Sequence, residues 1–262
     1  MGKQSWRDAA LARHYSYTAK SSGLGLPGLL FRAGEKTAMA NVVDALSADV
    51  PFIAGTLSGQ YATDSSITRQ LTSSFVGIPL SAQVPNIVLL KRGLGMLKLA
   101  GVGLGTKQRL SLEGDFDRTF TLYCPEGYER DALEIFTPNL MQRLMETTGG
   151  CDVELVDNWM FIYSLPGRYR SAEALAAVEQ ATALVQQTVQ RQTSRYTDER
   201  SPRSSGTVSP EQHAAQLHGV ASGGRRVKTS STPLQKLILA LSWAVFLAGA
   251  GYVVLTWLLP RL

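Results

Sequence analysis

The chain has 262 residues and a formal net charge of +5, and this length is enough for one ordinary domain with a hydrophobic core. The positive charge is local, because residues 191–236 hold eight basic and three acidic side chains, whereas residues 1–190 hold 17 basic and 18 acidic ones. A nearly neutral body presents no basic surface for DNA or RNA, so we expect no nucleic-acid partner.

The first hundred residues mix helical and strand-like patterns. A helix is predicted over residues 5–20, which carry Ala10, Leu11 and Tyr15, and one or two further helical turns over residues 38–46. Alternating or β-branched runs then predict a series of strands. These runs cover residues 52–61, 71–80, 86–91 and 109–113.

The clearest local pattern lies between Phe116 and Leu165. A half-buried strand is predicted over residues 120–124 and a helix over residues 128–136. Thr137 followed by Pro138 is typical of a helix start, and the apolar stripe that follows ends near residues 149–150. Residues 153–155 and 159–163, joined by Asp157 and Asn158, predict a β-hairpin. The order of strand, helix, helix and hairpin indicates an α+β class, with one globular domain over residues 1–192 built on a mainly antiparallel sheet and packed helices.

Part of this domain is similar to known sequences. The block from Leu112 to Ser164, LEGDFDRTFTLYCPEGYERDALEIFTPNLMQRLMETTGGCDVELVDNWMFIYS, resembles a segment of uncharacterised bacterial proteins that are associated with a membrane helix. The strand at Phe120, IFTPNLM at Ile135–Met141 and VDNWMFIY at Val156–Tyr163 carry the resemblance. It implies a membrane-associated α+β domain, and it brings no assigned activity, cofactor or site residue.

A helix that begins at Ser171 and continues to Gln192 completes the predicted domain. Its apolar residues recur at spacings of three and four, which is a heptad seam of about two repeats. The seam consists of Leu175, Val178, Thr182, Val185 and Val189. Two interpretations remain open: the helix packs on the sheet of its own domain, or the seam forms a homodimer contact.

Residues 193–233 are rich in Ser, Thr, Gly, Pro, Gln and Arg and contain few apolar side chains. This composition predicts a flexible basic linker between the domain and the end of the chain. A coil of about 40 residues has an r.m.s. reach of roughly 35 Å. The linker would therefore let the domain sample its surroundings.

The last segment, residues 234–262, is predicted to be a membrane anchor. Leu237 to Leu259 is a run of 23 residues without a charge, long enough for a transmembrane helix across about 30 Å of hydrocarbon. Trp257 and Tyr252 lie towards its far end, where aromatic side chains favour the interface. Small residues form one face of the span and are a candidate helix-dimer contact. They are Ala240, Ala244, Ala248 and Gly251.

Basic residues indicate the orientation of the span. Four of them precede it and only Arg261 follows it, so the positive-inside rule places the N-terminal domain in the cytoplasm. The same four side chains are expected to contact anionic lipid headgroups, at about 1 kcal/mol each near the surface. They are Arg225, Arg226, Lys228 and Lys236. The sequence thus predicts a tail-anchored, single-pass protein of the cell membrane.

Several groups of residues are candidate sites of chemistry. Gly101, Gly103 and Gly105 with Thr106 and Lys107 match neither phosphate-binding loop pattern, and we interpret them as a flexible loop. Five carboxylates are candidate ligands of a hard cation, although carboxylates on strands are more commonly surface residues. They are Asp115, Asp117, Asp152, Glu154 and Asp157. We therefore assign no catalytic, cofactor-binding or metal-ligating residue and expect no cofactor.

Three further features bear on function. His14 is the only histidine of the predicted domain, and no nucleophile motif accompanies it. Cys124 and Cys151 are expected to be reduced, partly buried thiols if the domain is cytoplasmic. The basic and apolar stretch 89–105 is predicted either to touch the bilayer surface or to form a core hairpin.

The favoured function is that of a non-catalytic scaffold or recruitment domain at the cytoplasmic face of a membrane, because the chain has an anchor, a tether and a folded head. Two alternatives remain: a membrane-tethered enzyme with an unrecognised site, and an accessory subunit of a membrane complex. An enzyme would require a pocket that holds charged residues with shifted pKa values.

Overall fold

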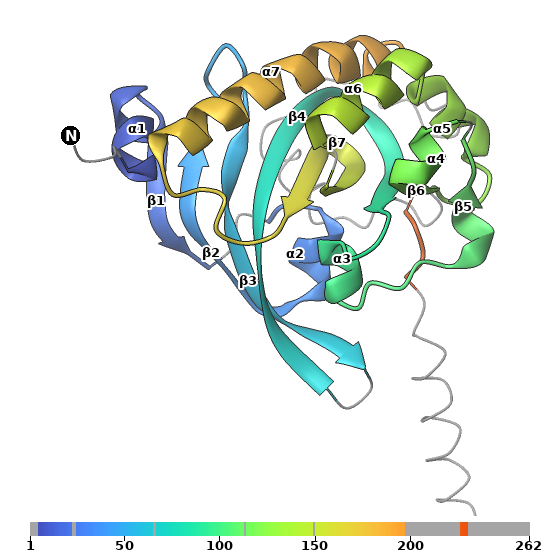
Figure 1. The fold of residues 1–262 in the computed structure, drawn as a ribbon, viewed down its shortest axis with the longest axis horizontal. Coiled ribbons are helices and arrows are strands. Elements are labelled where there is room, and N and C mark those ends of the chain that lie inside the picture. The colour runs from blue at the N-terminus through green and yellow to red at the C-terminus, as the bar shows by residue number, and fades with distance from the viewer. Residues whose placement is uncertain are drawn as a thin grey trace, which may run out of the picture.

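The computed structural model of the chain describes residues 5–22, 25–64, 67–112, 114–148, 150–196 and 226–229. They form a mixed α+β domain in which helices cover a curved sheet, and every strand pairing is antiparallel (Figure 1). The strands are β1 (Ser16–Ser21), β2 (Glu35–Asp44), β3 (Ile53–Asp64), β4 (Ile67–Lys91), β5 (Arg109–Leu110), β6 (Phe120–Tyr123) and β7 (Asp152–Ser164). The predicted fold class and sheet type are confirmed for this domain.

Strand β4 is the centre of the sheet. The strand order is β1-β2-β3-β4-β6-β5, and β7 also pairs with β4. In its first half, Val76 lies between Ala54 of β3 and Ile162 of β7; near its end, Val88 lies between Tyr123 of β6 and Glu154 of β7. Both halves of the sheet therefore depend on this one strand.

Strands β4 and β7 bend together, and the bend corrects two predictions. The predicted strands 71–80 and 86–91 are parts of β4, with shifts of register against β7 between Pro79 and Ile87. The predicted hairpin at residues 153–163 is wrong, since β7 continues through Asp157, which has a positive φ of 53°.

Two helix predictions near the N-terminus are also corrected. The helix predicted over residues 5–20 ends early: α1 spans Trp6–Ala12, and the chain then turns at His14, whose φ is 61°, into β1. The helix predicted over residues 38–46 is wrong, because this stretch belongs to β2. Strand β2 has partners on both sides, β1 and β3, and such pairing outweighs a weak helical preference.

The strands predicted over residues 52–61 and 120–124 correspond to β3 and β6, whereas the strand predicted over residues 109–113 is shortened to the two residues of β5. Helices α5 and α6 occupy the predicted stretches, and α7 begins after Ser171, whose hydroxyl accepts a hydrogen bond from the Ala174 amide. The remaining helices are short turns between strands. The helical elements after α1 are α2 (Leu29–Ala33), α3 (Met96–Leu99), η1 (Thr106–Gln108), α4 (Phe116–Thr119), α5 (Glu129–Ile135), α6 (Pro138–Thr148) and α7 (Ala172–Thr193).

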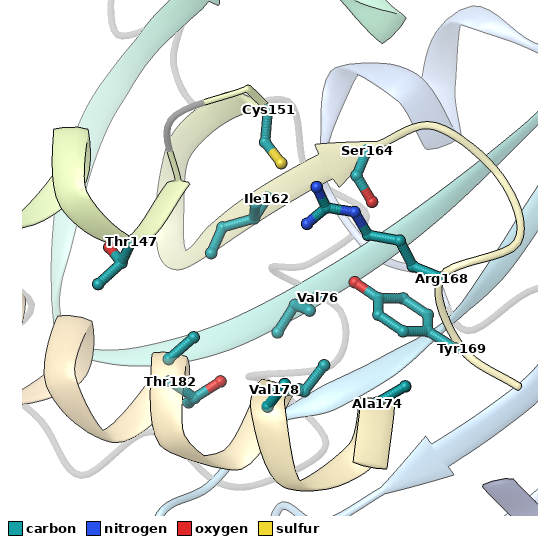
Figure 2. A pocket seen from close by; sticks show the side chains of 12 residues that line it. Val76, Thr147, Cys151, Ile162, Ser164, Arg168, Tyr169, Ala174, Val178 and Thr182 are labelled. Atoms are coloured by element: carbon teal, nitrogen blue, oxygen red, sulfur yellow. The ribbon is translucent and has the colours of Figure 1, made fainter. Parts of the chain in front are cut away.

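Helix α7 lies across one face of the sheet (Figure 1). All five residues of its heptad seam are buried, and Val178 and Thr182 are seen beside Val76 of β4 (Figure 2). The seam thus packs within its own domain, which is the first of the two interpretations of this helix.

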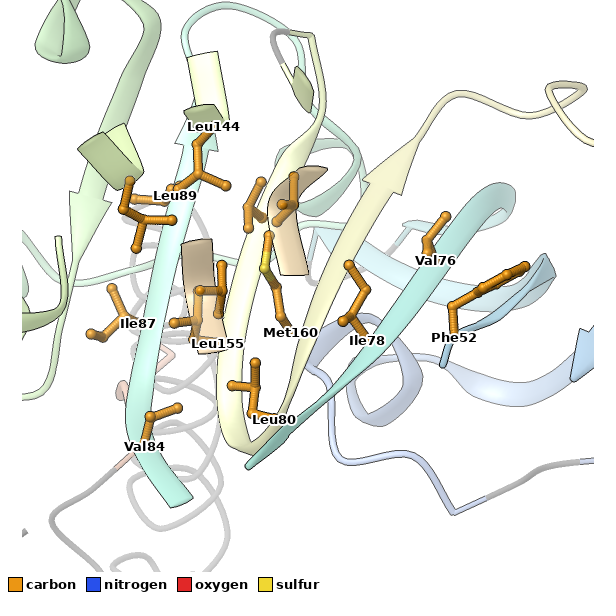
Figure 3. Packing of buried hydrophobic residues seen from close by; sticks show 14 of the residues in the cluster. Phe52, Val76, Ile78, Leu80, Val84, Ile87, Leu89, Leu144, Leu155 and Met160 are labelled. Atoms are coloured by element: carbon orange, nitrogen blue, oxygen red, sulfur yellow. The ribbon is translucent and has the colours of Figure 1, made fainter. Parts of the chain in front are cut away.

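Two apolar clusters lie on the two faces of the sheet. The larger one joins the sheet to α1, α6 and α7 and includes Ile78, Leu89, Leu144 and Leu155 (Figure 3). The second surrounds α2 and α3 and contains a ring cluster in which Phe31 of α2 packs edge-on to Phe75. The sheet is therefore covered on both faces.

No helix in the described part of the chain is long and apolar enough to cross a membrane. The predicted span Leu237–Leu259, with its small-residue face, lies outside that part.

The larger cluster yields a prediction about stability. Replacing Leu144, which is fully buried, by alanine should lower the free energy of unfolding by about 2 to 5 kcal/mol, because it removes apolar contacts and leaves a cavity. Leu133→Ala is the matched control, since Leu133 is 54% exposed and its truncation should cost less than about 0.5 kcal/mol. Urea denaturation followed by circular dichroism measures both, and equal losses would contradict the packing described.

Candidate functional site

Residues 226–229, within the predicted linker, lie against the domain; they are called the docked segment below. The Arg226 guanidinium donates from Nη2 to Oδ2 of Asp157 at 2.6 Å and from Nη1 to the Pro27 carbonyl at 3.4 Å. The side chain of Val227 is 6% exposed and belongs to the apolar cluster around α2 and α3. An ion pair and an apolar contact thus anchor two successive side chains.

The backbone of the docked segment is also paired. The Val227 amide donates to Oδ1 of Asn86 at 3.3 Å, and Gln108 both accepts from the Lys228 amide at 2.6 Å and donates to the Lys228 carbonyl at 2.8 Å. Thr229 forms a β-bridge with Leu104. The side-chain amide of Gln108 thus pairs with both backbone groups of Lys228, as a neighbouring strand would. The docked segment is drawn in orange near β6 (Figure 1).

Glu154 lies beneath the docked segment and is fully buried. Its Oε2 accepts hydrogen bonds from the Leu29 amide at 2.7 Å and the Tyr163 hydroxyl at 2.8 Å, and its Oε1 accepts one from Nδ2 of Asn86 at 2.9 Å. These donors come from α2, β7 and β4. Asn86 connects the carboxyl group to the docked segment, because its Oδ1 accepts from Val227.

The protonation of Glu154 is balanced between opposing effects. Burial raises its pKa from 4.5 to about 7, while the hydrogen bonds from Leu29, Tyr163 and Asn86 and the charge of Arg226 oppose the rise. Because Arg226 favours the ionised carboxylate, ionisation of Glu154 in turn favours the docked position of Arg226. We therefore expect the docked position of Arg226 to depend on the ionisation of Glu154.

The five candidate cation ligands have separate roles in the structure. Asp152 is buried and accepts from the amides of Lys91 at 2.9 Å and Leu97 at 2.8 Å, while Glu154 and Asp157 belong to the docking site. Asp117 accepts from the Leu112 amide, and Asp115 pairs with Arg118. The described residues include no group of three or more His, Cys, Asp or Glu that could hold a metal ion.

The other candidates are distributed over the domain. His14 is exposed in the turn between α1 and β1, and Cys124 and Cys151 are free, buried thiols. In the stretch 89–105 most apolar side chains are buried, as in the core interpretation, but Leu94 is 61% exposed. Gly101 has a φ of 70° and lies in the turn that follows α3.

Asn86, Gln108 and Tyr163 were not singled out from the sequence, although they build the docking site. Only Asn86 carries a local signal, because it is a polar amide directly before the apolar run Ile87–Leu90. A buried polar residue in such a strand requires a partner, but the sequence does not name that partner.

A pocket of about 160 Å³ opens under α7 (Figure 2). Apolar side chains make most of its wall: Val76 and Ile162 come from the sheet, and Ala174 and Val178 come from α7. Ser164, Arg168, Tyr169 and Cys151 line its polar side.

The ionisable side chains that line this pocket are Cys151, Arg168 and Tyr169. Burial raises the pKa of Cys151, which keeps the thiol neutral, and burial likewise raises the pKa of Tyr169. The twelve lining residues include neither a histidine nor a carboxylate that could act as a general base.

Comparison with known proteins adds one structural likeness. No family model matches the chain, and no curated protein matches it. The crystal structure of the mycobacterial trehalose monomycolate transport factor A, TtfA, is similar with 9% sequence identity and a TM-score of 0.47, over 70% of this chain and 92% of that chain.

The raised pKa of Glu154 predicts a pH-dependent stability. Between pH 4.5 and 7 the folded protein keeps a proton that the unfolded chain has released, so the free energy of unfolding should fall by about 3 kcal/mol as pH rises through this window. Glu154→Gln should abolish this fall in urea denaturation measured from pH 4.5 to 7.5. Glu134→Gln, at a largely exposed position on α5, should retain it. A wild-type profile in Glu154→Gln would contradict the assignment.

The docked segment yields a second prediction. Val227→Asp places a charge in the apolar cluster and should release the segment, so that amide exchange of residues 226–229 in the full chain accelerates at least tenfold. Thr229→Asp is the control, because the side chain of Thr229 is exposed and only its backbone is paired. Hydrogen–deuterium exchange with mass spectrometry gives the readout. Exchange that is already fast in the wild type would show that the segment is not docked.

Proposed function

We propose that this chain is a tail-anchored, single-pass membrane protein whose α+β domain serves as a non-catalytic scaffold or recruitment domain on the cytoplasmic side. Leu237–Leu259 is the proposed span, and residues 1–192 form the head. The docked segment is the observation that carries the proposal, because it relates the domain to the proposed anchor.

The docked segment shortens the tether. Thr229 is bound to the domain, and only seven residues separate it from Leu237, so this connection reaches at most about 29 Å when fully extended. Without docking, the chain from the end of α7 to the span would have a contour several times longer. The domain would therefore stay near the bilayer, with the face that carries α2, α3 and the docked segment closest to it.

The charge of that face supports this orientation. Residues 92–108, which connect β4 to β5 and run beside the docked segment, contain three basic side chains and no acidic one. Arg92, Lys98 and Lys107 are exposed, as is Lys228. Arg226 is paired with Asp157 within the protein. The contact with anionic headgroups is therefore made by these exposed cations, together with Arg225 and Lys236 from the predicted set.

The roles of the acidic residues support a scaffold rather than an enzyme. Asp152 holds backbone amides of β4 and α3, Asp157 holds Arg226, and Glu154 joins three elements. A binding head with a short tether suits the assembly of partners at a membrane surface. Its partner class is protein, and the small-residue face of the span offers a contact for a second helix.

Anchorage and orientation can be tested together. Full-length chain with tags at Met1 and Leu262 should float with membranes, and a chain that ends at Lys236 should not, because it lacks the apolar span. Protease added to intact cells should leave residues 195–203 uncut and should cleave them after permeabilisation. Cleavage in intact cells would place the domain outside the cytoplasm, and a soluble full-length chain would refute the anchor.

A span exchange separates the scaffold from a subunit of a membrane complex. Replacing Leu237–Leu259 by an unrelated apolar helix of equal length should leave the cytoplasmic cross-linking pattern unchanged if the head recruits partners. Loss of all cross-linked partners would instead show that the span makes the specific contacts.

A further inference from the structure

We infer that the pocket under α7 binds a small anionic amphiphile, a medium-chain carboxylate, with its alkyl chain against α7 and its carboxylate at Arg168. This site is separate from the docking site, and the inference does not depend on how the chain is anchored.

The shape and wall of the pocket select the apolar part of the ligand. Small side chains of α7, Ala174 and Ala181, leave room between the helix and Ile162 of β7. An apolar cavity of about 150 Å³ accepts a benzene ring, so a pocket of about 160 Å³ suits a chain of about six to eight carbon atoms. Binding of such a chain would remove the apolar wall from water, which lowers the free energy.

The polar side of the pocket selects the headgroup. Arg168 follows Gly167, whose φ of 92° turns the chain, and its guanidinium group is drawn between Cys151 and Tyr169 (Figure 2). Its positive charge acts on both of these residues, since it lowers the pKa of each against the effect of burial. Within the described residues Arg168 forms no ion pair, so its charge is available to a carboxylate.

The residues beside Arg168 hold this end of the pocket in place. Tyr169 is 7% exposed and stacks on Trp6 of α1, with ring centroids 5.0 Å apart. Ser164 of β7 lies beside it on the wall of the pocket. A site held in this way loses little entropy when a ligand binds.

Octanoate is the probe for this site, titrated by calorimetry into the full-length chain in lipid nanodiscs, with empty nanodiscs subtracted. We expect saturable binding of one octanoate, and at least tenfold weaker binding of octanol, which has the same chain but no charge. Arg168→Gln should weaken octanoate binding at least tenfold and leave octanol binding unchanged. Arg170→Gln, an exposed neighbour that does not line the pocket, is the matched control.

Filling the pocket provides an independent test. Ala181→Leu should weaken octanoate binding at least tenfold, whereas Ala176→Leu, on an exposed position of α7 outside the pocket, should leave it within twofold of wild type. Thermal unfolding establishes that both variants are folded. If Ala181→Leu does not fold, the comparison of Arg168→Gln with Arg170→Gln tests the inference. Absence of saturable octanoate binding, or binding that neither Ala181→Leu nor Arg168→Gln weakens, would overturn the inference.

Discussion

The burial of Glu154 with a complete set of hydrogen-bond donors is the interaction on which the rest of the structure depends. A carboxyl group without access to water is tolerated only when its oxygens are paired, and here the donors come from α2, β4 and β7. Their convergence fixes α2 against the sheet. It also orients Asn86, whose carbonyl oxygen then receives the backbone of the docked segment.

The same group joins the core of the domain to the proposed tether. Arg226 reaches Asp157 at the bend shared by β4 and β7, close enough to Glu154 for its charge to lower the pKa of that carboxyl group. The bend, the buried acid and the docked segment are thus energetically coupled. Asp157 lies at this irregular bend of the β4–β7 ladder, and the bend places its carboxylate for the contact with Arg226.

The docking site and the pocket under α7 lie on opposite faces of the sheet. One face carries the docked segment with α2 and α3, and the exposed cations of residues 92–109 lie beside it. The opposite face carries α7 and the pocket that ends at Arg168. Val76 of the pocket and Asn86 of the docking site both belong to β4, so this one strand contributes to both sites.

Local patterns in the sequence determined the α+β class, the start of α7 at Ser171, the helices α5 and α6, and the apolar run proposed to cross the membrane, because caps and hydrophobic periodicity act within a few residues. Only the tertiary structure decided that residues 35–44 are a strand, that β7 passes through Asp157 without reversing, and that residues 226–229 return to the domain. Strand partners and the donors of Glu154 come from distant parts of the chain, and no local pattern encodes such a meeting. The pocket has the same origin, since its alanines and Arg168 acquire a common role only when α7 lies across the sheet.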